Sequence, residues 1–175
     1  MDKNFLKPEE ILKQLSLKED MAAADFGSGS GGWAIPLAKI LKEGKVYAID
    51  ILEEPLSALK GKAELLNISN IELIRSDLEG ERGSKIEDDS LDLVLITNLL
   101  FETENKKEIL AEAKRILKGS GKILIVDWKP KASLGPKEGK ISVKEIQKIA
   151  KNLNLEVEKE LEAGDYHYAM LIKKP

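Results

Sequence analysis

A glycine-rich loop that begins with an acidic residue is the first feature of the sequence that could bind a ligand. The loop reads DFGSGSGG over residues 25–32, and it lies between an apolar run and a segment of helical spacing that begins near Trp33. Glycines allow a tight turn and bring backbone N–H groups against a ligand. In an open α/β fold such a loop lies at the carboxyl edge of the sheet, where ligands bind. The order of strand, glycine loop and helix therefore predicts a ligand-binding site.

The spacing of the loop glycines fits two classes of ligand. Gly27, Gly29 and Gly32 satisfy the dinucleotide fingerprint G-x-G-x-x-G, and Asp50 ends the next apolar run, where a ribose-binding carboxylate would lie. Asp25 places a carboxylate beside the space that a pyrophosphate would fill, and like charges there oppose phosphate binding. A ligand with an ammonium and a sulfonium, such as S-adenosylmethionine (SAM), would be attracted instead. SAM is therefore favoured, with an NAD-dependent reductase as the alternative.

Short apolar runs alternate with segments of helical spacing, which is typical of a parallel α/β sheet. The predicted helices are 8–17, 33–42, 56–66, 106–118 and 143–152. The predicted strands are 22–26, 46–51, 71–75, 91–97, 123–128, 155–161 and 166–172. Only a turn around 163–165 separates the last two strands, so they must pair as an antiparallel hairpin. We expect a seven-stranded sheet that is parallel apart from its last strand.

The ends of two predicted helices carry local signals. Asn105 with Glu108, and Ser142 with Glu145, have the spacing of a capping box, in which the first and fourth residues exchange hydrogen bonds. Gly119 follows the predicted helix 106–118, and glycine is a common residue just after a helix. These signals predict helix starts at 106 and 143 and a helix end before 119.

Composition limits the classes of function. The 175 residues suit one domain, 1–175, with an N-terminal helix within 1–20 and the sheet core in 21–175. The net charge of −3 gives no overall cationic field, so nucleic-acid binding is not favoured. Zero cysteines and one histidine exclude disulfides and multi-histidine metal sites; a carboxylate-only Mg²⁺ or Ca²⁺ site stays open, but no metal site is assigned. Without a leader or a long apolar run, we expect a cytoplasmic protein with no membrane span.

Taken together, the motifs resemble those of the class I SAM-dependent methyltransferases over essentially the whole chain. Asp25, Gly27, Gly29 and Gly31 match the acid-x-Gly-x-Gly-x-Gly loop of that superfamily. Further matches are Asp50 after the second strand, SDL at 76–78, DLVL at 92–95 and RILKGSG at 115–121. The resemblance implies a Rossmann-like three-layer α/β sandwich with strand order 3-2-1-4-5-7-6. It also implies SAM as cofactor and S-adenosylhomocysteine (SAH) as product.

Within the superfamily the chain is similar to the quinone-biosynthesis C-methyltransferases and the arsenite methyltransferases. The arsenite chemistry does not transfer, because that subgroup relies on cysteines and this chain has none. The Asn-Pro-Pro-Tyr motif of base-modifying methyltransferases reads NLLF at 98–101, which weakens that function. We therefore expect methyl transfer to a small molecule, with a non-catalytic SAM-binding protein as a further alternative.

The resemblance assigns roles to the cofactor residues. Asp25 would orient the methionine ammonium, Asp50 would accept both ribose hydroxyls, and Asp77 would accept from the adenine amine. The backbone of Leu78 would contact the adenine ring, and Ile51 would supply an apolar wall. The expected cofactor set is Asp25, Phe26, Gly27, Ser28, Gly29, Gly31, Asp50, Ile51, Ser76, Asp77, Leu78 and Asn98.

Three residues are candidates for the acceptor side of the site. Asn98 follows the fourth strand and could hold the methionine end or the acceptor, with helix capping as its alternative role. The antiparallel last strand begins at the carboxyl edge of its parallel neighbours, which brings Tyr166 and His167 there. His167 is a candidate proton acceptor because its ordinary pKa is near neutral, although a structural histidine is the alternative. Methyl transfer needs no base when the acceptor is already nucleophilic.

Overall fold

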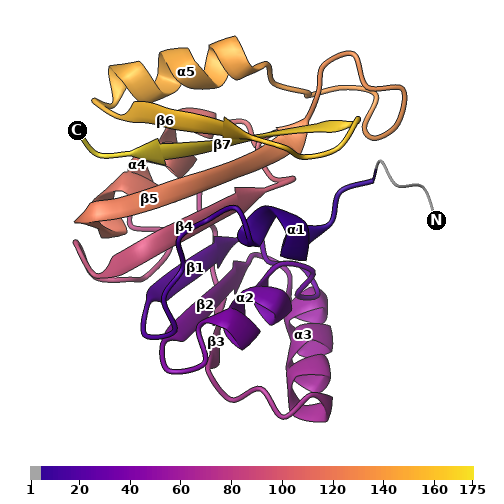
Figure 1. The fold of residues 1–175 in the computed structure, drawn as a ribbon, viewed down its shortest axis with the longest axis vertical. Helices are drawn as coiled ribbons and strands as arrows, with labels where there is room; N and C mark the ends of the chain where they lie inside the picture. Colours follow the sequence, from indigo (N-terminus) through magenta and orange to yellow (C-terminus); the bar gives the residue numbers. More distant parts are fainter. Residues whose placement is uncertain (1–4) are drawn as a thin grey trace.

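Seven strands form one sheet in the computed structural model, which describes residues 5–175 (Figure 1). They are β1 (Ala22–Phe26), β2 (Lys45–Asp50), β3 (Ile71–Arg75), β4 (Leu91–Thr97), β5 (Leu117–Trp128), β6 (Glu156–Leu161) and β7 (His167–Lys173). The order is β3-β2-β1-β4-β5-β7-β6. β7 is antiparallel to both β5 and β6, and the remaining pairs are parallel. The predicted fold class, strand order and final hairpin are confirmed.

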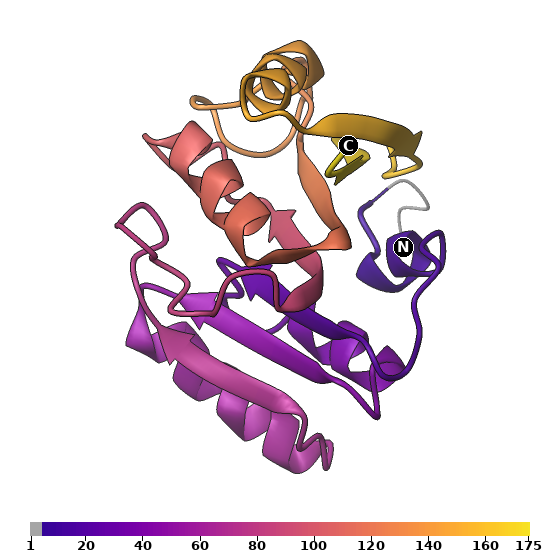
Figure 2. The same cartoon turned by 90° about the vertical axis from the view of Figure 1, so that its left-hand side faces the viewer.

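Helices cover both faces of this sheet. They are α1 (Pro8–Leu12), α2 (Ala34–Ile40), α3 (Glu53–Leu65), α4 (Lys106–Ile116) and α5 (Val143–Asn152). Figure 2 shows the two helix layers on opposite sides of the sheet. Within residues 5–175, no helix has both the length and the apolar character that a membrane crossing requires.

The strands are buried from both sides, so two hydrophobic cores form. Along β4, Leu93 and Leu95 pack with α1 and α2 residues, whereas Val94 and Ile96 pack with residues of α4 and α5. This alternation explains why β4 is a continuous apolar run, as is usual for the interior of a parallel sheet. The sheet is thereby a rigid support whose carboxyl edge carries the loops.

Some predicted boundaries are wrong. The first helix ends at Leu12 rather than at residue 17, and residues 1–4 of the predicted N-terminal segment lie outside the described residues. α4 ends at Ile116 because Leu117 already has extended backbone and begins β5, so Gly119 does not stop the helix. Gly121 is needed in β5 for close approach, since a Cβ there would lie 2.9 Å from the Leu91 carbonyl oxygen.

The two capping predictions have different outcomes. Ser142 and Glu145 form the full capping box at the start of α5, as predicted. α4 starts at Lys106 as predicted, but the Asn105 side chain makes no cap, so only the capping-box interpretation is wrong there. The Asn105 amide instead donates to Glu79 Oε2 at 3.1 Å, which joins α4 to a distant loop. A short sequence pattern cannot distinguish these two uses of an asparagine.

The two edge strands of the sheet are short and charged. In β6, Glu156, Glu158, Lys159 and Glu160 are exposed, while only Val157 and Leu161 are half-buried. In β3 at the opposite edge, Glu72 and Arg75 are exposed. The glycine loop after β1 and the loops after β2 and β4 lie at the carboxyl ends of inner strands, and the loop 76–90 follows the edge strand β3.

Candidate functional site

A cavity of about 390 Å³ opens at the carboxyl ends of β1, β2 and β3. Seven residues of the predicted cofactor set line it: Gly27, Gly29, Asp50, Ile51, Ser76, Asp77 and Leu78. Further lining residues that sequence reasoning did not select include Glu79, Leu99, Glu102, Thr103 and Ile109. Another cavity, of about 290 Å³, is lined by Asp92, Lys122 and neighbours and contains no predicted site residue. The cavity lined by Gly27 and Asp50 is therefore the candidate site.

The glycine loop adopts backbone conformations that favour glycine. Gly27, Gly29 and Gly31 have φ values of +70°, +52° and +93°. A Cβ on Gly31 would lie 2.3 Å from the Leu59 side chain, so this glycine also allows α3 to pack against the loop. A Cβ on Gly29 would meet nothing within 4 Å, which leaves its backbone open to the cavity. The loop thus has the shape predicted for a ligand cradle.

Asp50 joins the glycine loop to the end of β2. Its Oδ2 accepts from the backbone N–H of Gly29 at 2.8 Å, and its Oδ1 accepts from that of Leu52 at 3.0 Å. A carboxylate has about four lone-pair sites, so both oxygens keep capacity for a ligand hydroxyl. Asp50 therefore shapes the loop as well as lining the cavity.

Asp25 is a buried carboxyl group without a hydrogen-bond partner. The residue is 1% exposed, and neither Oδ1 nor Oδ2 has a partner. Burial raises the pKa of Asp25 to about 8; the backbone N–H of Ala34 lowers it and the neighbouring Asp50 raises it further. A buried polar group without a partner is costly, so a cationic ligand group at this position would remove a cost already present in the fold.

Among the described residues, Asp25 is one of four with buried polar side-chain atoms that lack a partner. The other three are Ser28, Asn98 and His167, at the same edge of the sheet. Asn98 directly follows β4 and has a left-handed backbone with φ of +49°, which asparagine tolerates better than most residues. Its backbone N–H donates to the Val126 carbonyl at 2.8 Å. Its side-chain Oδ1 is buried and has no partner. Strained backbone and orphaned polar atoms are typical of functional sites.

The cavity wall is acidic. Asp50, Asp77, Glu79 and Glu102 all line it, and burial followed by the charge of Asp50 raises the pKa of Glu102. Such a wall opposes phosphate groups and suits a ligand with positive groups and hydroxyl donors. The donor and acceptor set, with the orphaned Asp25 carboxyl and the open Gly29 backbone, therefore fits SAM better than a dinucleotide.

His167 and Tyr166 lie at the same edge of the sheet but do not line this cavity. His167 begins β7 opposite Trp128, and the two rings are tilted by 39° with centroids 4.0 Å apart. Burial, followed by the charge of Lys129, lowers the pKa of His167 to about 4. The Phe5 ring lies 6.1 Å from that of Tyr166 and 6.2 Å from that of His167. Four aromatic side chains thus lie together at the start of β7: Phe5, Trp128, Tyr166 and His167.

Asp127 is a buried residue to which the sequence analysis gave no role. It lies at the end of β5 and is 0% exposed. Its Oδ2 accepts from the Leu100 N–H at 3.0 Å, and its Oδ1 accepts from the Trp128 N–H at 2.8 Å. Burial raises its pKa to about 6, against the lowering effect of these backbone hydrogen bonds. Asp127 thereby ties the loop after β4 to the end of β5. The available signal was a charged residue inside the apolar run 123–128.

Comparisons with known proteins agree with this geometry. The family described as "methyltransferase domain" matches residues 17–172. The chain is 29% identical to a demethylmenaquinone methyltransferase of Bacillus mycoides over 132 residues, which are 75% of this chain and 54% of that protein. It spans about half the length of the curated relatives it matches.

Solved structures match more of the chain. A SAM-dependent methyltransferase from Aquifex aeolicus has a TM-score of 0.86 at 29% identity, covering 96% of this chain and 89% of that one. An arsenic(III) SAM methyltransferase from Chlamydomonas reinhardtii shares the fold, with a TM-score of 0.71 at 19% identity over 90% of this chain and 65% of that one. The matches confirm the resemblance drawn from the motifs, and they do not favour an NAD-dependent reductase. This chain belongs to the methyltransferase domain family, within the superfamily of class I SAM-dependent methyltransferases.

Proposed function

We propose that the protein transfers the methyl group of SAM to a small-molecule acceptor and releases SAH. The observation that carries this proposal is the buried, unpartnered carboxyl of Asp25 beside a glycine loop and a carboxylate-lined cavity. Bound SAM supplies an electrophilic methyl group on a sulfonium. The acceptor would take this methyl group and SAM would leave as SAH, and water or a side chain near the acceptor would take up any proton that the acceptor loses.

In this proposal the cofactor extends from Asp25, which does not itself line the cavity, along the cavity to Leu78. Asp25 pairs with the amino group of the methionine end, next to Ser28 and the glycine loop. Asp50 accepts from the ribose hydroxyls with the lone pairs that Gly29 and Leu52 leave free. Ser76, Asp77, Leu78 and Ile51 surround the adenine, Gly27 lines the cavity beside the cofactor, and Phe26 and Gly31 shape the loop from behind.

The acceptor side lies, in this proposal, between Asn98 and the start of β7. Support comes from Asn98 Oδ1 and both ring nitrogens of His167, which are buried without partners. Tyr166, Trp128 and Phe5 give that end apolar surfaces for a flat or apolar molecule. The name of the Bacillus mycoides relative, demethylmenaquinone methyltransferase, agrees with a small-molecule acceptor.

Calorimetry with SAH and NADH tests the cofactor part of this proposal. We expect saturable SAH binding and no measurable NADH binding, because the acidic cavity wall repels the two phosphates of NADH. Saturable NADH binding without heat from SAH would contradict it. A screen with methyl-labelled SAM against pools of metabolites, RNA and protein then tests the acceptor class, and transfer to RNA or protein alone would refute a small-molecule acceptor.

His167→Ala should reduce turnover of an identified acceptor by about two- to tenfold, the range for losing one neutral hydrogen bond. With a pKa of about 4, the imidazole is neutral and a poor base at pH 7. The loss should therefore be constant between pH 6 and 8, and SAH affinity should not change. His167→Gln keeps a donor and an acceptor and should restore part of the rate. A rate limb near neutrality that disappears in His167→Ala would show instead that His167 is a general base.

A further inference from the structure

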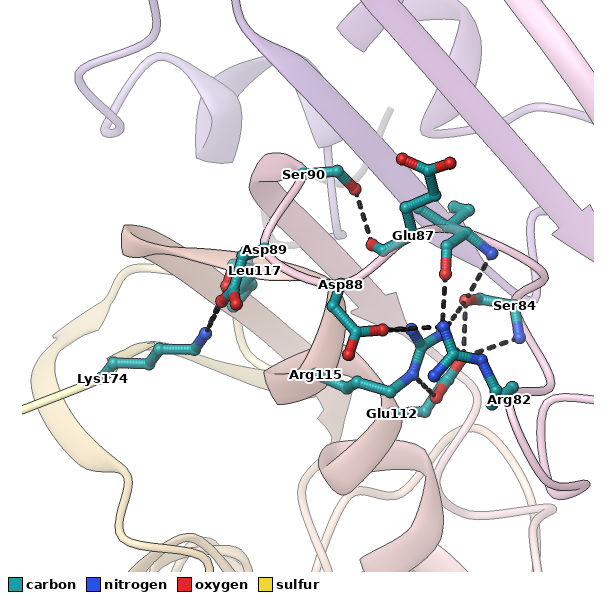
Figure 3. Close-up of polar contacts among 11 residues, drawn as sticks. Arg82, Ser84, Glu87, Asp88, Asp89, Ser90, Glu112, Arg115, Leu117 and Lys174 are labelled. Atoms are coloured by element: carbon teal, nitrogen blue, oxygen red, sulfur yellow. Dashed lines mark hydrogen bonds and ion pairs between the residues drawn. The ribbon is translucent and has the colours of Figure 1, made fainter.

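Arg115 on α4 is the centre of a group of polar contacts with the loop 76–90, which connects β3 to β4 (Figure 3). Its guanidinium donates to Glu112 Oε2 at 2.8 Å, to the Ile86 carbonyl at 2.8 Å and to Asp88 Oδ1. The Arg115 side chain is 18% exposed and that of Glu112 is 7% exposed, so their contact is largely shielded from water, whereas Asp88 is 55% exposed. The planar guanidinium is the side chain best suited to several partners in fixed directions.

Glu112 extends the group into the loop. Its Oε1 accepts from the Ser84 backbone N–H at 2.9 Å and from the Ser84 hydroxyl at 2.5 Å. Ser84 is 0% exposed and Glu112 is 7% exposed. Burial alone would raise the pKa of Glu112, but the hydrogen bonds from Arg115 and Ser84 lower it. Glu112 is therefore ionised, and both of its oxygens are used.

Gly83, the residue before Ser84, connects this contact to the candidate cofactor cavity. A Cβ on Gly83 would lie 2.3 Å from the Asp77 carbonyl oxygen and 2.8 Å from the Leu78 Cα. The backbone at Gly83 therefore packs directly against Asp77 and Leu78, two of the loop residues that line the cavity. A shift of Ser84 would displace Gly83 and hence Asp77 and Leu78.

The loop has little regular structure of its own to hold its shape. Arg82, Lys85 and Asp89 have positive φ values of +50°, +58° and +49°, which non-glycine residues adopt only when their surroundings require it. Glu79 adds a second attachment at the start of α4, where it accepts from the Glu104 N–H at 3.1 Å and from Asn105. α4 thus contacts the loop near both of its ends.

We propose that Glu112 and Arg115 are positioning residues that hold the loop 76–90 against α4 so that Asp77 and Leu78 keep their places in the cofactor cavity. The proposal rests on the proposed binding of adenosine in that cavity. A role in stability alone explains less well why a buried ion pair stands at this place. Replacing a buried ion pair by apolar residues often leaves stability unchanged or raised, so stability alone does not require one here.

The experiment compares affinity with stability in ligand-binding and thermal unfolding measurements. The variants are Glu112→Gln, Arg115→Lys and the double replacement Glu112→Leu with Arg115→Met. The probes are SAH and 5′-deoxy-5′-methylthioadenosine, which keeps the adenosine and lacks the amino-acid end. Asp92→Asn is the control, because Asp92 pairs with Lys118 and the Ala22 N–H and does not line the cofactor cavity.

We expect each variant to bind both probes about tenfold more weakly, within the range of couplings between contacting groups. The turnover number at saturating SAM should stay unchanged. In the double replacement the weak binding should persist even where the melting temperature returns to that of the wild type, whereas Asp92→Asn should lose stability only. Wild-type affinity for both probes in every folded variant would overturn the positioning role. If the wild-type protein binds neither probe, the proposed function and this inference both fail.

Discussion

Asp25→Asn should weaken SAH binding by roughly 10- to 150-fold at pH 8, the range of about 1.5–3 kcal/mol for a hydrogen bond to a charged group. The replacement keeps the shape of the buried side chain and removes the charge that would meet the ligand ammonium. Neither carboxyl oxygen has a hydrogen-bond partner in the free protein, and an asparagine Oδ1 can still face the Ala34 N–H that lowers the pKa of Asp25, so no hydrogen bond of the fold is lost. The melting temperature of the ligand-free protein should therefore stay the same or rise.

The same carboxyl should make SAH binding depend on pH. With a pKa of about 8, Asp25 is mostly protonated at pH 7 in the free protein, and a bound ammonium would lower that pKa. Affinity should rise with pH up to about 8, by close to tenfold per unit at its steepest, with almost one proton released per SAH at pH 7. Asp25→Asn should abolish both effects. Calorimetry in buffers of different ionisation enthalpy measures the released proton, and equal heats in all buffers would refute this role.

Stability of the ligand-free protein should respond to pH through the same group. The folded-state pKa of Asp25 is raised above its unfolded value of 3.8, so the folded protein retains a proton that the unfolded chain releases. This contribution is fully present below pH 4 and is lost as the pH rises to about 8. His167 acts in the opposite direction, because its pKa falls from 6.5 to about 4 and its contribution is lost as the pH drops through that window.

Asp50→Ala should weaken SAH binding by roughly 1–3 kcal/mol, since the ribose hydroxyls lose a charged acceptor. Unlike Asp25→Asn, it should also lower the unfolding free energy by roughly 1–2 kcal/mol, because the N–H groups of Gly29 and Leu52 lose their partner. From the sequence, Asp50 is expected to bind the ribose and its removal to change stability little; the hydrogen bond to the glycine loop changes the second expectation.

Isothermal calorimetry and thermal unfolding of the same samples check the Asp50 prediction. Asp50→Asn is the matched control, because its amide oxygen can keep one of the two backbone contacts while the charge is gone. It should retain more stability than Asp50→Ala and lose a similar share of the affinity. An unchanged SAH dissociation constant in Asp50→Ala would show that Asp50 only supports the loop.

The sheet could be predicted from sequence because its signals are local. β1, β3 and β4 begin and end as predicted, since each is a short apolar run bounded by turn residues or charges. The prediction failed where a residue type has two uses. Gly119 suggests a helix end, yet it lies within β5, next to the point where the pairing of β5 with β4 shifts register between Leu91 and Leu93 of β4.

The candidate site was partly predictable for the same reason. Asp25, Gly29 and Asp50 lie within or next to a recognisable loop. Gly29 and Asp50 line the cavity, and Asp25 has buried carboxyl oxygens without partners. The contact between Glu112 and Ser84 joins residues 28 positions apart and leaves no pattern in the sequence. Such a contact depends on how α4 packs over the loop, which periodicity does not specify.

The charged edge strands have a consequence for the behaviour of the protein at high concentration. An exposed strand edge offers unpaired backbone groups to another chain, which is a route to aggregation. Exposed charges on β6 and the shortness of β3 make such pairing costly, since a second copy would bring like charges into register. The closing hairpin thus limits growth of the sheet beyond its seven strands.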